Sequence, residues 1–311
     1  MHPRAFRKLR YFLIIIGVIG AAWLGGAGFA PAVPASASEA EPACNDADRR
    51  PATAVFKTLL IVIKNTDIPQ KTTQNHDLAP FPGARSSMPP DKIDQALRAY
   101  GQFGDWVERV SCGQARIDAS AVVSEVPLKD VQLRRTRSGQ SDLLRVEAVP
   151  KDFAPWFDRY HAASYDSVFV WVNVADARGN YLPLVNQGAT YSPRLPGLGP
   201  ISVLYGARFD LDIVRWQVFA HEFAHQLEMF YKPFRDVALP YCAIDSKKAP
   251  PVHCQDAFGY RPDADVPKGA PRQWSQWLRD YYAKKIWDQA SQQFVGLGPT
   301  AWNHGTRLQP R

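Results

Sequence analysis

Two runs of consecutive β-branched and aliphatic residues constrain the fold of this chain more than any other sequence feature. The first run lies within residues 57–64, and the second, residues 167–174, contains Val-Phe-Val-Trp-Val. A strand with one face in water alternates apolar and polar residues, whereas a fully covered strand is continuously apolar. The first run therefore predicts a buried strand, and the second is the strongest strand signal in the chain.

Helical spacing of apolar residues marks several segments around these strands. The first, residues 91–110, can begin at Asp91 as its N-terminal cap and end before Gly113. It places on one face the residues Ile93, Leu97, Tyr100, Phe103 and Val107. The other predicted helices cover residues 152–163, a segment starting near Asp210 or Asp212, and residues 274–286.

Further strands and loops complete the expected order of elements. Strands are predicted over residues 116–128 and 201–205, and the charged stretch 129–139 is expected to be exposed. Residues 175–200 and 232–272 are rich in Gly, Pro or Asn and predict loops. Because strands interleave with helices and a long helix follows the last strand, one α+β domain is expected.

The N-terminus has the three parts of a secretory signal peptide. Four basic residues within residues 4–10 precede the apolar stretch 11–30, and Ala35-Ser36-Ala37 offers a cleavage site after Ala37. We expect a signal peptide over residues 1–37, a leader over 38–54 and the functional domain over 55–311. An uncleaved membrane anchor is the alternative, because the apolar stretch is long enough to span a bilayer. Both readings place the domain outside the cytoplasmic membrane, as a secreted or cell-envelope protein.

Charge and composition exclude several classes of protein. The net charge of +7 falls to +3 when the four basic residues of residues 1–37 are removed. No basic run with interleaved aromatic residues remains, so we expect no nucleic-acid partner. Hydrophobic residues make up 46% and charged residues 22%, which argues against disorder and against a multi-span membrane protein.

Four cysteines lie in the exported part of the chain. In an oxidising compartment an even number favours disulfides, and four cysteines allow three pairings. We favour Cys242–Cys254, which closes a short loop, together with Cys44–Cys112. Buried thiols are the alternative, whereas a four-cysteine zinc site is disfavoured because no Cys-x-x-Cys pair exists.

The chemistry of the chain is indicated by five residues, His221-Glu222-Phe223-Ala224-His225, in an apolar segment with helical spacing. The two histidines are one helical turn apart, about 6 Å along the axis, so both imidazoles can bind one metal ion. Glu222 lies about 100° around the helix, where it can reach a metal-activated water without binding the metal. This arrangement predicts Glu222 as the general base of a zinc hydrolase.

The motif and the order of elements before it resemble the zincin superfamily of zinc metallopeptidases. The resemblance implies a mixed sheet with packed helices, a central active-site helix and a helical and loop-rich C-terminal part. It also implies an edge strand bordering the cleft, which we assign to residues 201–205, along which a peptide substrate would extend the sheet.

The third metal ligand departs from the large zincin branches. No glutamate follows Glu228, and Glu228 and Tyr231 stand where metzincins have Gly and His. No methionine follows Met229, so the metzincin methionine turn is missing. We favour His253, beside a predicted disulfide, as third ligand. The alternatives are Asp256, Asp236 and Asp245.

Several polar and aromatic residues have weaker assignments. Glu228 faces the metal side of the helix, where it either orients a histidine or a loop or is a partly exposed charge. Tyr260 is a candidate for stabilising a tetrahedral intermediate, with core packing as the alternative. Surface or local roles are expected for His76, His161 and His304. Core packing is expected for the aromatic residues Trp274, Trp277, Tyr281, Tyr282 and Trp287.

These features together predict a secreted, Zn²⁺-dependent endopeptidase that binds metal through His221, His225 and His253 and uses Glu222 as general base. The expected partner is a protein or peptide substrate, and no nucleic-acid partner is expected. We expect membrane association only if the N-terminal segment is uncleaved, and we expect a monomer. Two further functions stay open: a zinc hydrolase acting on a non-peptide bond, and a non-catalytic cell-surface binding module.

Overall fold

A computed structural model describes residues 44, 51–71, 78–79, 81, 83–138, 141–147, 149–173, 188–192, 197–205, 216–244, 247–261 and 274–309. The chain divides into two units, Met1–Glu39 and Ala40–Arg311, and every described residue belongs to the second. The predicted signal peptide, residues 1–37, therefore lies outside the described residues. Within them, no helix is long and apolar enough to cross a membrane.

Five helices and fourteen strands form the described part of the chain. The strands are β1 (Ala54–Ile63), β2 (Asn65–Ile68), β3 (Leu78–Ala79), β4 (Ala84–Ser87), β5 (Ala115–Ser124), β6 (Gln132–Ser138), β7 (Ser141–Glu147), β8 (Ser167–Val172), β9 (Gly188–Tyr191), β10 (Ile201–Tyr205), β11 (Ala243–Ile244), β12 (Lys247–Lys248), β13 (Ile286–Asp288) and β14 (Gln293–Val295). The helices are α1 (Pro90–Val110), α2 (Ala154–Arg159), α3 (Gln217–Tyr231), α4 (Trp274–Tyr282) and α5 (Gly298–Asn303).

The central sheet is mixed and has the strand order β5-β1-β8-β10-β9. The first four strands are parallel, and β9 pairs antiparallel with β10. The expected mixed sheet with packed helices is thus confirmed, but the expected edge strand is wrong. Residues 201–205 form β10 inside the sheet, and the edge is β9, in a segment we expected to be loop. A four-residue strand among glycines and prolines is too short for its periodicity to be recognised.

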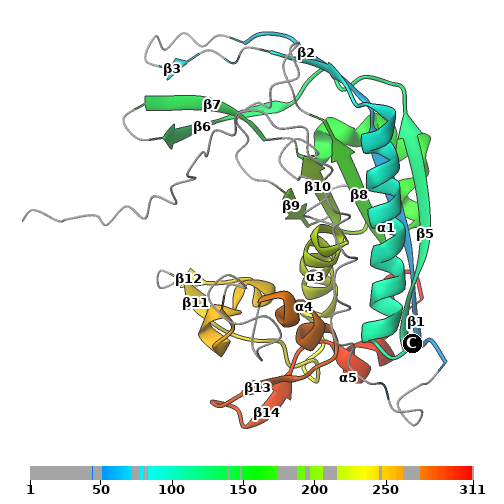
Figure 1. Ribbon diagram of the computed structural model, residues 1–311, viewed down its shortest axis with the longest axis vertical. Coiled ribbons are helices and arrows are strands. Elements are labelled where there is room, and N and C mark those ends of the chain that lie inside the picture. Colours follow the sequence, from blue (N-terminus) through cyan, green and yellow to red (C-terminus); the bar gives the residue numbers. More distant parts are fainter. Residues whose placement is uncertain are drawn as a thin grey trace, which may run out of the picture. The chain divides into compact units, whose positions relative to one another are not determined.

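Both faces of the sheet are covered, as the continuous apolar run in β1 requires. Leu60 and Val62 join the core beneath α1 and α3, whereas Leu59 and Ile61 join the core on the side of α2. Successive side chains of a strand point to opposite faces, so a strand buried on both faces cannot include the usual polar alternation. Figure 1 shows α1 running alongside β5 in front of the sheet.

The core between α1, α3 and the sheet is built largely from aromatic rings. Phe103 of α1 is fully buried and lies 5.4 Å from Phe223 and 6.1 Å from Phe219, measured between ring centroids. Phe169 of β8 packs against the same rings, at 5.9 Å from Phe103. These contacts fix α3 against the sheet through one of its faces and leave the opposite face for the site described below.

Several predicted element boundaries differ from the structure. Helix α1 begins at Pro90, and Asp91 is not its N-terminal cap. Asp91 lies in the first turn, where its negative charge interacts favourably with the helix dipole. The helix predicted over residues 152–163 is the short α2 flanked by 3₁₀ turns. Ile286, placed in the last helix by its spacing, belongs to β13. The stretch predicted only as exposed, 129–139, contains β6.

Both predicted disulfides are present. Cys44 bonds Cys112, which joins the N-terminal part of the described chain to the end of α1, and Cys242 bonds Cys254 across twelve positions of sequence. Stable disulfides are typical of proteins in oxidising compartments, so their presence agrees with an extracellular location.

Replacing Phe103 tests whether this aromatic core holds the fold. Phe103→Ala removes a ring with 0% exposure, and we expect the free energy of unfolding to fall by about 3–5 kcal/mol. Urea unfolding followed by circular dichroism measures the change. Phe294→Ala is the matched control, because that ring is 52% exposed and its loss should cost about 0.5 kcal/mol or less. Equal losses in both variants would contradict this account of the core.

Candidate metal centre

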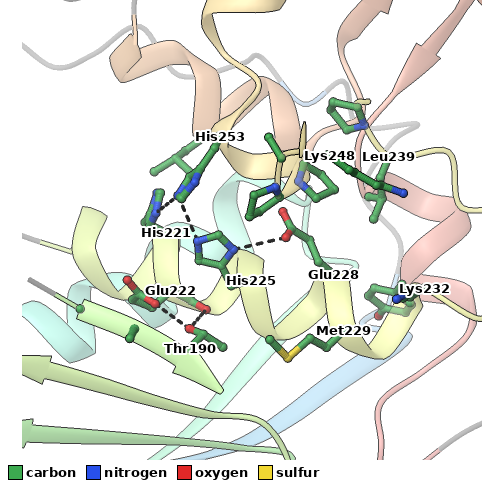
Figure 2. A pocket seen from close by; sticks show the side chains of 18 of the residues that line it. Thr190, His221, Glu222, His225, Glu228, Met229, Lys232, Leu239, Lys248 and His253 are labelled. Carbon is green, nitrogen blue, oxygen red and sulfur yellow. Dashed lines mark hydrogen bonds and ion pairs between the residues drawn. The ribbon is translucent and has the colours of Figure 1, made fainter. Parts of the chain in front are cut away.

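Three histidine rings converge on one point at the wall of a cleft. His221 and His225 lie one turn apart on α3, and His253 ends a 3₁₀ turn that packs against that helix. The Nε2 atom of His253 lies 3.1 Å from Nε2 of His221 and 3.2 Å from Nε2 of His225. Figure 2 shows the three rings facing one another. The structure thus brings together all three residues predicted as ligands.

The separations between these nitrogen atoms fit a single metal ion. A tetrahedral ion with bonds of about 2.0–2.1 Å to imidazole nitrogens holds its ligand atoms about 3.3 Å apart. The separations of 3.1 and 3.2 Å from His253 are close to this value, and the candidate ligand atoms of all three histidines lie within 4.8 Å of one another. Among the described residues, these three histidines form the one group of His, Cys, Asp or Glu side chains that could hold a metal ion. On a tetrahedral ion, three protein ligands would leave one coordination position open, as in catalytic zinc sites.

Glu228 fixes the orientation of His225 and of the loop that carries His253. Its Oε2 atom lies 3.3 Å from Nδ1 of His225, and its Oε1 atom accepts hydrogen bonds from the Val252 N–H at 2.6 Å and the Tyr281 hydroxyl at 3.0 Å. A carboxylate only accepts, so the ring of His225 donates from Nδ1 and directs the lone pair of Nε2 toward the cluster. Of the two roles that the sequence allows for Glu228, the contacts match that of an orienting residue.

Two further constraints hold the His253 loop in place. The disulfide between Cys242 and Cys254 ties down the residue that follows His253. On the other side, the Trp277 indole N–H donates to the Val252 carbonyl at 2.6 Å, which attaches the loop to α4. A ligand that comes from a loop needs such anchors, because an unrestrained loop loses conformational entropy when the metal binds.

Glu222 points toward the edge strand on the other side of the cluster from Glu228 (Figure 2). The Thr190 hydroxyl donates to its Oε2 atom at 2.6 Å. Its Oε1 atom fills the space beside Gly188, where an added Cβ would lie 2.8 Å away from it. A glycine at this position is therefore needed for the carboxylate to lie against β9.

Burial shifts the pKa values of His221, His253 and Glu222. The pKa of His221 falls to about 3, mainly because the ring is buried and also because His225 and His253 repel a second positive charge. Burial also lowers the pKa of His253, although Glu228 opposes this. Neutral imidazoles are the form that binds metals. The pKa of Glu222 is raised by burial, an effect that the Thr190 hydrogen bond reduces.

The cluster opens into a cleft of about 1200 Å³. One wall is formed by α3 with the histidines and Glu222, and another by Gly188 and Thr190 of the edge strand. The remaining lining is largely apolar and includes Leu239, Pro240, Pro250 and Pro251. This volume is larger than the range of about 300–1000 Å³ that is usual for small-molecule sites.

Two residues considered for the site are engaged elsewhere in the fold. Tyr260 is buried, donates to Asp280 Oδ2 at 2.7 Å and packs against Trp277, so its contacts match core packing and not the candidate role at the reaction centre. Asp236 accepts from His304 at 2.9 Å, outside the histidine group.

The remaining aspartates and histidines do not join the metal-binding group either. Asp256 is exposed and is not part of the group. His161 is exposed as expected, whereas Asp245 and His76 lie outside the described residues. The predicted helix caps Asp210 and Asp212 lie outside them as well.

Sequence reasoning missed the residues that reach the site from neighbouring elements. Thr190 lies in a segment predicted as loop, and Tyr281 was assigned to the core, where its ring is indeed buried. The strand that carries Thr190 reads Gly-Ala-Thr-Tyr and contains a single β-branched residue, which is too weak a signal to predict a strand.

Comparisons with known proteins do not assign the chain to a protein family. Neither a protein-family model, nor a curated protein, nor a solved structure matches it.

Replacing Glu228 tests its orienting role at the metal centre. Glu228→Gln keeps the shape of the side chain, but its NH₂ group cannot accept the hydrogen bonds that one carboxylate oxygen now accepts. We expect the Kd for zinc to rise about 10–100-fold, measured by competition with a chelating dye. Glu125→Gln, at a carboxylate that is 72% exposed, is the control and should leave the Kd unchanged. An unchanged Kd in both variants would refute the role.

The low pKa of His221 predicts how acid acts on the metal-free protein. The unfolded ring takes up a proton near pH 6.5 whereas the folded ring resists protonation until about pH 3, so acid favours the unfolded chain. The free energy of unfolding in EDTA should be highest above pH 6.5 and fall as the pH drops toward 3. Urea titrations at pH 7 and 5 measure the loss, which should be smaller in His221→Asn. The control His161→Asn, at an exposed ring, should retain the full loss.

Proposed function

We propose that this chain is a secreted zinc-dependent endopeptidase of zincin type, in which His221, His225 and His253 bind zinc and Glu222 is the general base. The observation that carries the proposal is the meeting of three imidazole Nε2 atoms and a buried glutamate in one open cleft. A structural zinc site has no need of such a carboxylate or of an open cleft.

The fold around the motif supports this assignment. The resemblance to zincins implies a mixed sheet, a cleft-bordering edge strand and a helix that carries the motif. Strand β9 is an antiparallel edge strand, it contacts α3, and the chain continues through β10 toward that helix. The third ligand comes from a short turn 28 positions after His225, which distinguishes this chain from the two large zincin branches.

The side chains of the site have separate tasks in peptide hydrolysis. When bound, the zinc ion lowers the pKa of a water molecule and polarises the carbonyl group of the substrate. Glu222 accepts the proton from the attacking water and then donates it to the departing amide nitrogen, which leaves as an amine. The raised pKa of Glu222 favours this task, because a base is most effective when its pKa is near the working pH.

The cleft suits an extended polypeptide better than a small molecule. Its volume is large, and β9 borders it as the outer strand of the central sheet. An outer strand has backbone N–H and C=O groups on one side that a substrate strand can pair with, and the apolar lining can receive side chains. These features favour a peptide over a non-peptide substrate.

Export from the cell follows from the N-terminal sequence and agrees with the disulfides. Cys242–Cys254 lies beside a proposed zinc ligand, so the site would benefit from an oxidising environment.

Glu222→Gln tests the proposal, because it removes the base and leaves the ligands in place. We expect the purified wild-type protein to contain one zinc ion by elemental analysis and to cleave members of a peptide library detected by mass spectrometry. Glu222→Gln should retain the zinc and lose activity by about 10²–10⁴-fold. His253→Ala should lose most of the zinc.

Glu108→Gln is the control, because that residue is exposed on α1, and it should keep both zinc and activity. Absence of stoichiometric metal, or full activity of Glu222→Gln, would refute the proposal. Zinc with no cleavage of any peptide would favour the non-peptide hydrolase or the binding module instead.

A further inference from the structure

A chain of hydrogen bonds joins the interior of the sheet to the carboxylate of Glu222. The Gln226 side-chain Nε2 donates to Ser202 Oγ at 2.6 Å, and Ser202 Oγ lies 2.7 Å from Thr190 Oγ1. The Thr190 hydroxyl in turn reaches Glu222 Oε2 at 2.6 Å. Gln226, Ser202 and Glu222 are 2%, 0% and 6% exposed, whereas Thr190 is half-buried at the wall of the cleft. Solvent therefore competes least for the bond between Gln226 and Ser202.

The direction of every bond in this chain follows from the groups at its two ends. The Val168 carbonyl can only accept, and it lies 3.3 Å from the Gln226 Nε2 atom, which sets the orientation of the amide. Ser202 accepts from that amide and has one proton left, which it donates to Thr190. Thr190 then has its own single proton for Glu222, whose ionised carboxylate can only accept. Each hydroxyl proton is used once.

The register of the edge strand explains why these groups meet. Thr190 and Ser202 are opposite residues of the antiparallel pair β9–β10, so their side chains share one face of the sheet. Gly188 precedes Thr190 by two positions and lies on the same face. Thr190 therefore contacts Oε2 of Glu222 while the missing side chain at Gly188 leaves space for Oε1.

We infer that Thr190 is the positioning residue of the general base, and that Ser202 and Gln226 fix the direction of its hydroxyl. This inference rests on the proposed function for its catalytic consequence. A glutamate side chain has several rotamers, and a base displaced by about 1 Å can lose about 100-fold in rate. Holding Glu222 by a directed hydrogen bond selects one of these rotamers before substrate binds.

The same contact links substrate binding to the base. Thr190 belongs to the strand that a peptide would pair with, and its hydroxyl also lies 3.2 Å from the backbone carbonyl of Glu222. A peptide that orders β9 would therefore also order the carboxylate. A purely structural role for Thr190, tying β9 to α3, predicts lower stability but no specific effect on the chemical step.

Two substitutions at Thr190 separate these roles. Thr190→Val replaces the hydroxyl by a methyl group of similar size, and Thr190→Ser keeps the hydroxyl and removes the methyl group. We expect Thr190→Val to lower kcat about 10–100-fold, with KM and the Kd for zinc unchanged, and Thr190→Ser to restore most of kcat. Ser202→Ala should lower kcat less, because the Thr190 hydroxyl stays but loses its fixed direction.

Ser192→Ala is the matched control, because this exposed hydroxyl lies two positions further along the chain and contacts Met229 instead. It should leave kcat unchanged. Equal kcat in Thr190→Val and the wild type would overturn the inference while leaving the proposed function intact. A loss of kcat in Thr190→Val that Thr190→Ser fails to restore would overturn it too.

Crystal structures of the Val and Ser variants give a readout that needs no activity. In Thr190→Val the Glu222 carboxylate should leave its place against β9, and in Thr190→Ser it should keep that place. A Glu222 carboxylate that stays in place in Thr190→Val would overturn the inference, whether or not the protein is active. Absence of both metal binding and peptide cleavage would refute the proposed function separately.

Discussion

Two carboxylates buried on one helix, Glu222 and Glu228, are the feature on which the site depends. Burying a charge is costly unless it is paired or hydrogen-bonded, and each glutamate obtains its partners from other segments of the chain. Glu222 is held by Thr190 of β9, and Glu228 by the loop before His253 and by Tyr281 of α4. The site can therefore form only when α3, the edge strand, the loop and α4 have packed together.

The different periodicities of the sheet and of α3 determine which side chains pack in the core and which face the site. A period of 3.6 residues places Phe219 and Phe223 toward the sheet and His221 and His225 toward the cleft. In β9 a period of two residues directs Gly188 and Thr190 toward the helix. The helix thus presents two of the three clustered histidines and the proposed base on the face opposite the aromatic core. The strand supports the base from a face that contacts this helix.

Local patterns made much of the fold and part of the site predictable. The apolar runs of β1 and β8 required buried strands, and two histidines four positions apart on a helix must lie on one face. His253 and both disulfides were predicted because few histidines and cysteines remained to choose from. No local pattern indicates the features that depend on residues distant in sequence. These features are strand β9, the hydrogen bond between Tyr260 and Asp280, and the contacts of Glu228.

The sequence by itself determined the helix with its pair of imidazoles, the glutamate between them and the covered sheet beneath, because these follow from spacing along a single element. Only the tertiary structure decided which strand forms the edge, that His253 reaches the other two rings, and which hydroxyl holds Glu222. The physical reason is that a hydrogen bond spans about 3 Å and a bond from imidazole to zinc about 2 Å, and only folding brings distant segments of a chain that close.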